Sequence, residues 1–192
     1  MIAEISPGRA RGTVCAPPSK SYAHRMMLCA ALAQGESILH GVSDCEDLRA
    51  TLDCIRALGA DARLEGDVLT VRGRSSGGFA DFPCRESGST LRFFLPVALA
   101  AAGGGRFTGT PRLLERGAGV YETLFSARGI RMEKTACSVT VRGALTPGVY
   151  ELPGDVSSQF VSGMLLALPL LDGGSVVRVR PPVESRGYID IT

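Results

Sequence analysis

An internal repeat with a nearly constant period is the feature that most constrains how this 192-residue chain can fold. Each copy begins with a cluster of hydroxyl side chains, and an apolar helix rich in Leu and Ala follows it. The clusters are centred on Ser21, Ser89 and Ser158, which are 68 and 69 residues apart. We expect the helices over residues 22–33, 90–101 and 159–168. A fixed period of this length indicates that the chain is built from copies of one supersecondary unit.

The segments after these helices repeat as well. A Gly-rich turn leads into a short strand, which we expect over residues 37–41, 106–109 and 175–179. The first two copies then continue with an amphipathic helix, expected over 47–58 and 119–128, and a hairpin, expected over 60–73 and 130–143. Gly59 and Gly129 follow these two helices, at the position where glycine commonly ends a helix. The repeating unit is therefore helix, strand, helix and hairpin, a compact α/β module.

The third copy stops before its unit is complete. Thr192 stands about twenty residues short of the period that the first two copies set. We therefore expect two full repeats, residues 14–73 and 74–143, and a shortened third repeat, residues 144–192. The spacing predicts that this chain is one portion of a longer protein.

The composition argues against several functions. With 21 Lys and Arg residues against 19 Asp and Glu residues, the formal net charge is +2, unlike that of a general nucleic-acid binder. The six cysteines form no CxxC pair and the two histidines are His24 and His40, so metal-ligand spacing is missing. No stretch approaches the roughly 18 apolar residues of a membrane span, and residues 1–7 do not resemble a secretion signal. We expect a cytoplasmic protein that binds neither a membrane nor nucleic acid.

The start of each apolar helix is a candidate anion site. Backbone N–H groups and the positive end of the helix dipole are free there, so three such ends could converge on one anion. For a single copy, ordinary capping of the helix by Ser is the simpler explanation. Cations accompany the hydroxyls, however, at Lys20, Arg25, Arg92 and Arg116. Because Lys acts as a point charge and Arg as a two-pronged donor, this grouping indicates a small ligand with phosphate and carboxylate groups.

Five segments, in order, resemble the signature motifs of EPSP synthases, the 3-phosphoshikimate 1-carboxyvinyltransferases of the shikimate pathway. They are PSKSYAHR at 18–25, SGSTLR at 87–92, GTPRLLER at 109–116, DVSSQF at 155–160 and SRGYID at 185–190. The resemblance implies an α/β fold of βαβαββ units around a pseudo-threefold axis, an inside-out barrel with central helices and an incomplete third repeat. It also implies that residues 1–13 form a strand segment packed against a second domain, whereas residues 14–192 form the N-terminal substrate-binding domain.

The resemblance implies a reaction as well. EPSP synthases transfer the enolpyruvyl group of phosphoenolpyruvate to the 5-hydroxyl of shikimate 3-phosphate, which yields EPSP and phosphate for aromatic amino acid biosynthesis. No metal and no organic cofactor is implied, and the acid and base groups are expected in the second domain. We therefore expect this chain to bind shikimate 3-phosphate without turnover. Two alternatives stay open: a UDP-N-acetylglucosamine enolpyruvyl transferase, and a non-catalytic module that binds anions.

The motifs carry the family's binding residues onto this chain. Those that would hold the 3-phosphate are Ser157, Ser158 and Ser185. Those that would orient the shikimate ring and its carboxylate are Ser21, Arg25, Gln159 and Tyr188. Those that would face phosphoenolpyruvate are Lys20, Gly88, Arg116 and again Gln159. Lys20 would also reach shikimate 3-phosphate, so it is shared by the two substrates.

Glu86 departs from the family pattern, in which Asn usually stands at this position. Its carboxylate brings a negative charge to a site for anions. Three arrangements are open, namely an ion pair with Lys20, an ion pair with Arg92, or an outward turn of the side chain. The property that this substitution puts in question is the affinity for phosphoenolpyruvate.

Overall fold

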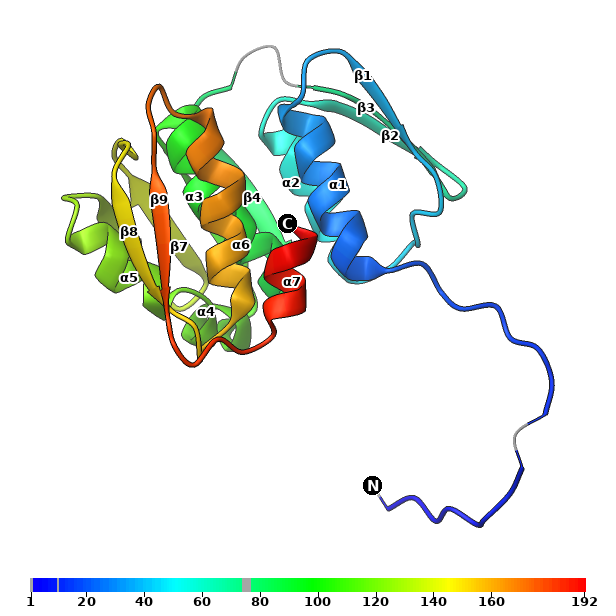
Figure 1. Ribbon diagram of the computed structural model, residues 1–192. Coiled ribbons are helices and arrows are strands. Elements are labelled where there is room, and N and C mark those ends of the chain that lie inside the picture. Colours follow the sequence, from blue (N-terminus) through cyan, green and yellow to red (C-terminus); the bar gives the residue numbers. More distant parts are fainter. Residues whose placement is uncertain (1, 10, 74–76) are drawn as a thin grey trace.

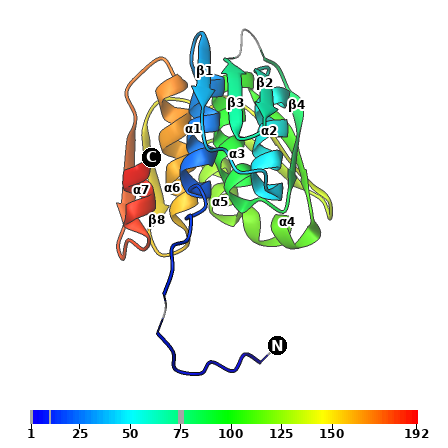
Figure 2. The same cartoon turned by 90° about the vertical axis from the view of Figure 1, so that its right-hand side faces the viewer.

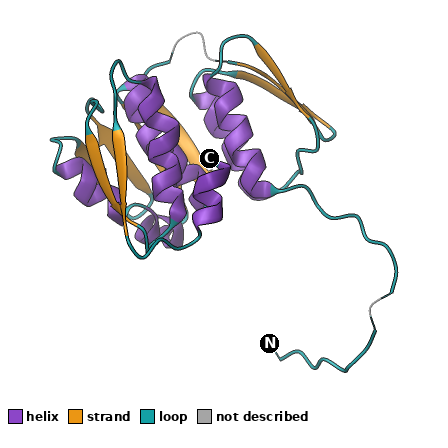
Figure 3. Cartoon of the chain, in the orientation of Figure 1, coloured by secondary structure: helices purple, strands orange, loops and turns teal. Residues whose placement is uncertain are grey.

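The computed structural model describes residues 2–9, 11–73 and 77–192 of the chain. Helices fill its middle and sheets lie outside them, as Figures 1 and 3 show. The expected mixed α/β architecture with central helices is thereby confirmed. The N-terminal residues 2–9 and 11–19 contain neither helix nor strand and extend away from the body of the molecule (Figures 1 and 2). That they pack as a strand against a second domain stays a prediction.

The first repeat follows the predicted order. It consists of α1 (Lys20–Leu32), β1 (Glu36–Leu39), α2 (Glu46–Ala57), β2 (Asp61–Glu65) and β3 (Val68–Arg72). The hairpin turns at Gly66, whose φ of +63° favours glycine. β1 joins the other edge of β3, which gives an antiparallel sheet of order β1-β3-β2. α1 and α2 pack against one face of this sheet (Figure 1).

The second repeat contains one strand and one helix that the sequence patterns did not predict. It consists of β4 (Ala80–Arg85), α3 (Gly88–Ala102), β5 (Gly104–Gly109), α4 (Pro111–Gly117), α5 (Gly119–Ser126), β6 (Arg131–Lys134) and β7 (Ser138–Arg142). The sheet order is β4-β5-β7-β6, in which β4 runs parallel to β5 and the other pairs are antiparallel. β4 contains Pro83, which an edge strand tolerates. The unpredicted elements are β4 and α4.

The third repeat begins in the same way as the second. It consists of β8 (Val149–Pro153), α6 (Ser158–Ala167), a 3₁₀ helix (Leu168–Leu170), β9 (Val176–Arg180) and α7 (Arg186–Ile191). β8 and β9 pair in parallel, as β4 and β5 do. This repeat thus has two strands where the second has four, in agreement with the expected incomplete unit. None of the helices in the described residues is long and apolar enough to span a membrane.

Two core helices, α3 and α6, pack closely against each other. Pro96 lacks a backbone N–H, which leaves the carbonyl oxygen of Arg92 without its partner in α3. The hydroxyl of the fully buried Tyr121 lies 2.9 Å from this oxygen and 2.8 Å from the carbonyl oxygen of Phe160. Gly163 of α6 faces the same point, where a Cβ would overlap with the Tyr121 hydroxyl and the Arg92 carbonyl. The two helices therefore meet at a glycine contact.

Candidate anion-binding site

The three core helices begin with the same kind of cap. Each is preceded by a serine in extended backbone whose side chain accepts a hydrogen bond from a backbone N–H of the first turn: Ser19, Ser87 and Ser157. Ser21 and Ser89 are the second residues of their helices, whereas Ser158 is the first residue of α6. The residue of α6 that corresponds to Ser21 and Ser89 is therefore Gln159. The predicted repeat of hydroxyls is one residue out of step in the third copy.

These helix ends open onto one cavity of about 500 Å³. All ten residues predicted to bind ligands line it: Lys20, Ser21, Arg25, Gly88, Arg116, Ser157, Ser158, Gln159, Ser185 and Tyr188. Four further residues line the same cavity: Asp47, Glu86, Ser89 and Arg92. The fold thus brings side chains from all three repeats to one place. The described residues hold no group of three or more His, Cys, Asp or Glu side chains that could bind a metal ion.

Lys20 forms the wall of the cavity on the side of the first repeat. It opens α1 and pairs with Asp47 in the first turn of α2, with 2.5 Å between Nζ and Oδ2. The hydrogen bond with Asp47 raises the pKa of Lys20, against a smaller lowering by burial. Lys20 is therefore fully charged at neutral pH. Sequence reasoning missed Asp47, because its partner is 27 residues away and on another helix.

Arg92 forms the wall between the second and third repeats. Its Nη1 donates to Oε1 of Gln159 at 2.5 Å, and its Nε and Nη2 donate to the carbonyl oxygens of Gly117 and Arg116, each at 3.2 Å. Nε2 of Gln159 in turn donates to Oγ of Ser89 at 2.8 Å. Burial lowers the pKa of Arg92. In the described parts of the chain its partners are neutral oxygen atoms, so its positive charge is available to an anion.

Arg25 is almost wholly buried, with 6% of its surface exposed. Its Nη1 donates to the carbonyl oxygen of Ser21 at 2.8 Å, and its Nε to the hydroxyl of Thr192 at 2.7 Å. Its Nη2 donates to the hydroxyl of Ser162 and to the carbonyl oxygen of Tyr188, each at 2.9 Å. Burial lowers the pKa of Arg25. All three nitrogen atoms are thus engaged within the protein, and Arg25 fastens α1 to α6 and α7.

Glu86 lines the cavity without forming an ion pair with Lys20 or Arg92. Its Oε1 accepts a hydrogen bond from the Thr110 hydroxyl at 3.3 Å, and Thr110 is the cap of α4. Of the three arrangements that were open, the side chain therefore takes the one that avoids both cations. It leaves an exposed carboxylate in the lining of a cavity that contains Lys20, Arg25, Arg92 and Arg116.

Central helices, outer sheets and a cavity of cations, hydroxyls and helix N-termini define an α/β domain of repeated units that suits an anionic ligand. Comparison with known families identifies the family within this class. The sequence model of the family EPSP synthase (3-phosphoshikimate 1-carboxyvinyltransferase) matches residues 5–192. The chain therefore belongs to the EPSP synthase family, as its five motifs predicted.

Two named relatives and one solved structure define the extent of the similarity. A 3-phosphoshikimate 1-carboxyvinyltransferase of Clostridium botulinum (strain Alaska E43 / Type E3) is 40% identical over an alignment of 198 positions, gaps included, and this alignment covers 98% of this chain and 46% of that protein. That of Clostridium perfringens (strain SM101 / Type A) is 37% identical over an alignment of 193 positions, with the same coverage of the two chains. The EPSP synthase structure from Acinetobacter baumannii has a TM-score of 0.72 at 24% identity, over 91% of this chain and 41% of that one. It shows the same fold. This chain spans a little under half the length of its curated relatives.

Proposed function

We propose that this chain is the substrate-binding half of a 3-phosphoshikimate 1-carboxyvinyltransferase. That activity transfers an enolpyruvyl group from phosphoenolpyruvate to the 5-hydroxyl of shikimate 3-phosphate and releases phosphate. The observation that supports it most is that the ten residues predicted from separate motifs line one cavity. Membership of the family supports the same reaction. Both substrates carry a phosphate and a carboxylate, which suits the cations and helix ends of the cavity.

We assign the 3-phosphate of shikimate 3-phosphate to the hydroxyl groups at the entrances to α6 and α7. Ser157 caps α6, Ser158 opens it, and Ser185 precedes α7 in left-handed backbone. Free backbone N–H groups at the start of α6 add donors to these hydroxyls. A phosphate held in this way needs no lysine or arginine directly beside it. The cations of the cavity therefore remain for the carboxylate and for the second substrate.

The shikimate ring and its carboxylate would lie against Ser21, Gln159 and Tyr188, with Arg25 behind them. The nitrogens of Arg25 already hold the backbone oxygens of Ser21 and Tyr188. We therefore give Arg25 the role of fixing these two residues relative to each other, in addition to its charge. Tyr188 is 47% exposed, so its ring is free to contact a ligand. Such fixed placement lowers the entropy lost when a substrate is bound.

Phosphoenolpyruvate would bind on the side of Lys20, Gly88, Arg116 and Gln159. Lys20 is paired with Asp47, so it would share its charge between Asp47 and the substrate. Gly88 leaves space for a ligand at the start of α3. A Cβ at this position would lie 3.2 Å from Nη1 of Arg92 and would crowd this cation. Charge that develops on the phosphate and carboxylate during transfer would be stabilised by these fixed donors.

The part of the reaction that we assign to this chain is binding and orientation. The carboxylates that line the cavity in the described residues are Asp47 and Glu86. Asp47 is engaged with Lys20, and Glu86 with Thr110. We place the acid and base groups in the second domain, as the resemblance implies, since proton transfer needs a group within hydrogen-bond reach of the reacting atom. On its own this chain would bind shikimate 3-phosphate without turnover.

Isothermal titration calorimetry with shikimate 3-phosphate tests the binding proposal. We expect the wild-type chain to bind and Ser158→Ala to bind about tenfold more weakly, because a hydrogen bond to a charged group is lost. Ser126→Ala, which removes an exposed hydroxyl of α5 away from the cavity, serves as the matched control and should bind as the wild type does. A folded wild-type chain that gives no binding heat would refute the proposal.

Two further measurements define the activity. A phosphate-release assay with both substrates should give no turnover by the chain alone, and clear turnover would contradict the placement of the acid and base groups. Titration with UDP-N-acetylglucosamine should give no saturable binding. Saturable binding of that sugar nucleotide, without binding of shikimate 3-phosphate, would favour the other enolpyruvyl transferase.

A further inference from the structure

The second repeat enters the cavity through a tight turn at the end of β4. The backbone N–H of Ser87 donates to the carbonyl oxygen of Cys84 at 2.8 Å, which closes a four-residue turn. Within this turn Arg85 has a φ of +54°, in the left-handed region that residues with a side chain rarely adopt. Glu86 and Gly88 follow it and line the cavity. The direction of the turn therefore decides where these groups lie.

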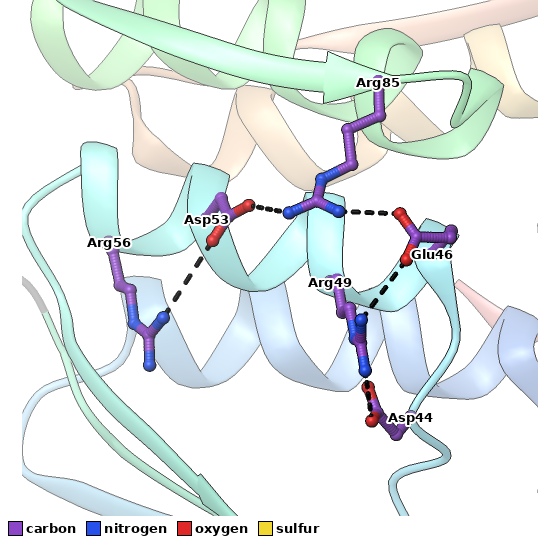
Figure 4. Close-up of polar contacts among 6 residues, drawn as sticks. All are labelled: Asp44, Glu46, Arg49, Asp53, Arg56 and Arg85. Atoms are coloured by element: carbon purple, nitrogen blue, oxygen red, sulfur yellow. Dashed lines mark hydrogen bonds and ion pairs between the residues drawn. The ribbon is translucent and has the colours of Figure 1, made fainter.

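The side chain of Arg85 spans from this turn to α2 in the first repeat. Its Nη1 donates to Oε2 of Glu46 at 2.7 Å, and its Nη2 donates to Oδ2 of Asp53 at 2.8 Å (Figure 4). The two acids are two helical turns apart and so share one face of α2. Arg49 and Arg56, at 3.3 and 4.0 Å, hold the same two carboxylates from within α2. A planar guanidinium that bridges two carboxylates on a rigid helix has little freedom to move.

The backbone of Arg85 is held from the opposite side. Its carbonyl oxygen accepts a hydrogen bond from the N–H of Thr110 at 2.9 Å. Gly109 packs against the same oxygen, because a Cβ there would lie 2.9 Å from it. The turn is thus braced between α2 and the start of α4. The strained left-handed backbone of Arg85 persists because the contacts with α2 and with the start of α4 hold it in place.

The first turn of α2 also connects two walls of the cavity. Asp47 pairs with Lys20 on α1, and the adjacent Glu46 pairs with Arg85. We propose that Arg85 is a positioning residue, whose bridge to Glu46 and Asp53 holds the left-handed turn that sets Glu86 and Gly88 at the ligand cavity. The effect of the Arg85 bridge on ligand affinity rests on the proposed function, because that function names the ligand. The effect of the bridge on the conformation of the turn is a property of the ligand-free protein, so it can be tested without that function.

Removal of the two acids separates positioning from simple electrostatics. The double variant Glu46→Gln with Asp53→Asn leaves Arg85 in place and makes the surroundings of the cavity more positive. Charge alone would then tighten the binding of an anion, whereas loss of the bridge would weaken it. The control is Glu36→Gln with Asp61→Asn, which removes two exposed acids paired with arginines on the outer sheet of the first repeat. A third variant, Arg85→Gly, keeps a backbone that accepts positive φ and removes the side chain.

Two readouts are measured on the full chain, the amide NMR resonances of Gly88 and Ser89 without ligand and the dissociation constant for shikimate 3-phosphate. We expect the double variant and Arg85→Gly to move both resonances and to weaken binding about fivefold, with the two changes not additive. The control should leave the resonances in place and bind at least as tightly as wild type. Urea midpoints within the range of the control show that the fold is intact.

Resonances that stay in place in the double variant, or binding that is unchanged or tighter, would overturn the proposal. Resonances that stay in place in Arg85→Gly would do so too, because the backbone would then hold the turn without the side chain. If wild type fails to bind shikimate 3-phosphate, the proposed function is refuted. The ligand-free resonances then decide whether Arg85 holds the turn.

Discussion

The second repeat meets its two neighbours in different ways. Its contact with the third repeat depends on close packing, since α3 and α6 touch at Gly163 with Tyr121 packed beside them. Its contact with the first repeat includes a buried chain of polar side chains. His24 Nδ1 lies 2.6 Å from the Thr51 hydroxyl, which lies 2.8 Å from that of Thr90, which donates to Ser87 at 2.6 Å. The cavity is lined by residues of all three repeats, so it borders on both contacts.

The hydrogen bonds of this polar chain are all donated in one direction, from His24 towards Ser87. Because Thr90 donates its hydroxyl proton to Ser87, Thr51 must donate to Thr90, and His24 must donate from Nδ1 to Thr51. Nε2 of His24 is then a bare acceptor, and it is buried with no hydrogen-bond partner in the described residues. Burial, with a smaller contribution from Lys20 and Arg25, lowers the pKa of His24 to about 4 despite the nearby Asp47. The imidazole is neutral at pH 7.

The two contacts should therefore respond to different changes. The glycine contact does not change its charge near neutral pH, because burial raises the pKa of Tyr121 well above its ordinary value, but it tolerates no added atom. A hydrogen-bonded chain tolerates a small change of volume, but it fails when a proton is added or a hydroxyl is removed. Because the walls of the cavity belong to different contacts, changes on either side should reach the bound ligand by separate routes.

Gly163→Ala should have the largest effect, because it breaks the close contact. The added methyl group would overlap with the Tyr121 hydroxyl and with the backbone carbonyl of Arg92, which cannot move aside as a side chain could. We expect a loss of about 3 kcal/mol in the free energy of unfolding, measured by urea denaturation. Gly119→Ala, in α5 where a Cβ would meet no atom within 4 Å, is the control and should not destabilise. Equal stability of the two variants would show that the α3–α6 contact is looser than described.

Much of the fold could be predicted from the sequence, because the signals that define each repeat are local in the sequence. Apolar helices after a serine cap, a glycine after each amphipathic helix and alternating hairpins are all local signals. The ten residues predicted to bind ligands belong to motifs, and the fold brings them to one cavity; that they bind ligands stays a prediction. Strand β4 was not predictable from the sequence, because Pro83 interrupts its strand pattern and because the strand forms by pairing with β5.

The residues that hold the site in place were less predictable, because their partners are far away in the sequence. Asp47 reads as an ordinary acid in the first turn of a helix until Lys20 is seen beside it. Gly163 reads as a weak point in α6 until Tyr121 and Arg92 occupy the space beside it. Arg85 lies just before the second motif and is not part of it, and its backbone is held at a φ of +54° by contacts with α2 and with the start of α4. Such roles depend on tertiary packing, which a single sequence does not state.

Acid should act on the polar contact alone, with an effect second to that of Gly163→Ala. The pKa of His24 is about 4 in the folded chain and about 6.5 when unfolded. The unfolded state therefore takes up the proton first, so stability is present in full above pH 6.5 and is lost as pH falls toward 4. Linkage gives a loss of about 2 kcal/mol by pH 5. Urea unfolding at pH 7.5 and pH 5.0 measures it.

His24→Asn isolates this contribution from that of other titrating groups. Its amide can still donate to Thr51, but it takes up no proton in this range. The difference in stability between pH 7.5 and pH 5.0 should shrink by about 2 kcal/mol in this variant. A variant that loses as much stability in acid as wild type would place the acid sensitivity in another group.

Thr51→Val should have the smallest of the three effects, because it removes one hydroxyl at nearly constant volume. Nδ1 of His24 would lose its partner, whereas Thr90 would keep Ser87. An unpaired buried donor that can partly relax should cost about 1 kcal/mol in the free energy of unfolding at pH 7.5. Thr123→Val, at an exposed position of helix α5, controls for the helix propensity of valine and should change stability little. If Thr51→Val were as stable as this control, the chain from His24 to Ser87 would contribute nothing to the contact between the first two repeats. The contrast with the α3–α6 contact would then rest on the titration of His24 alone.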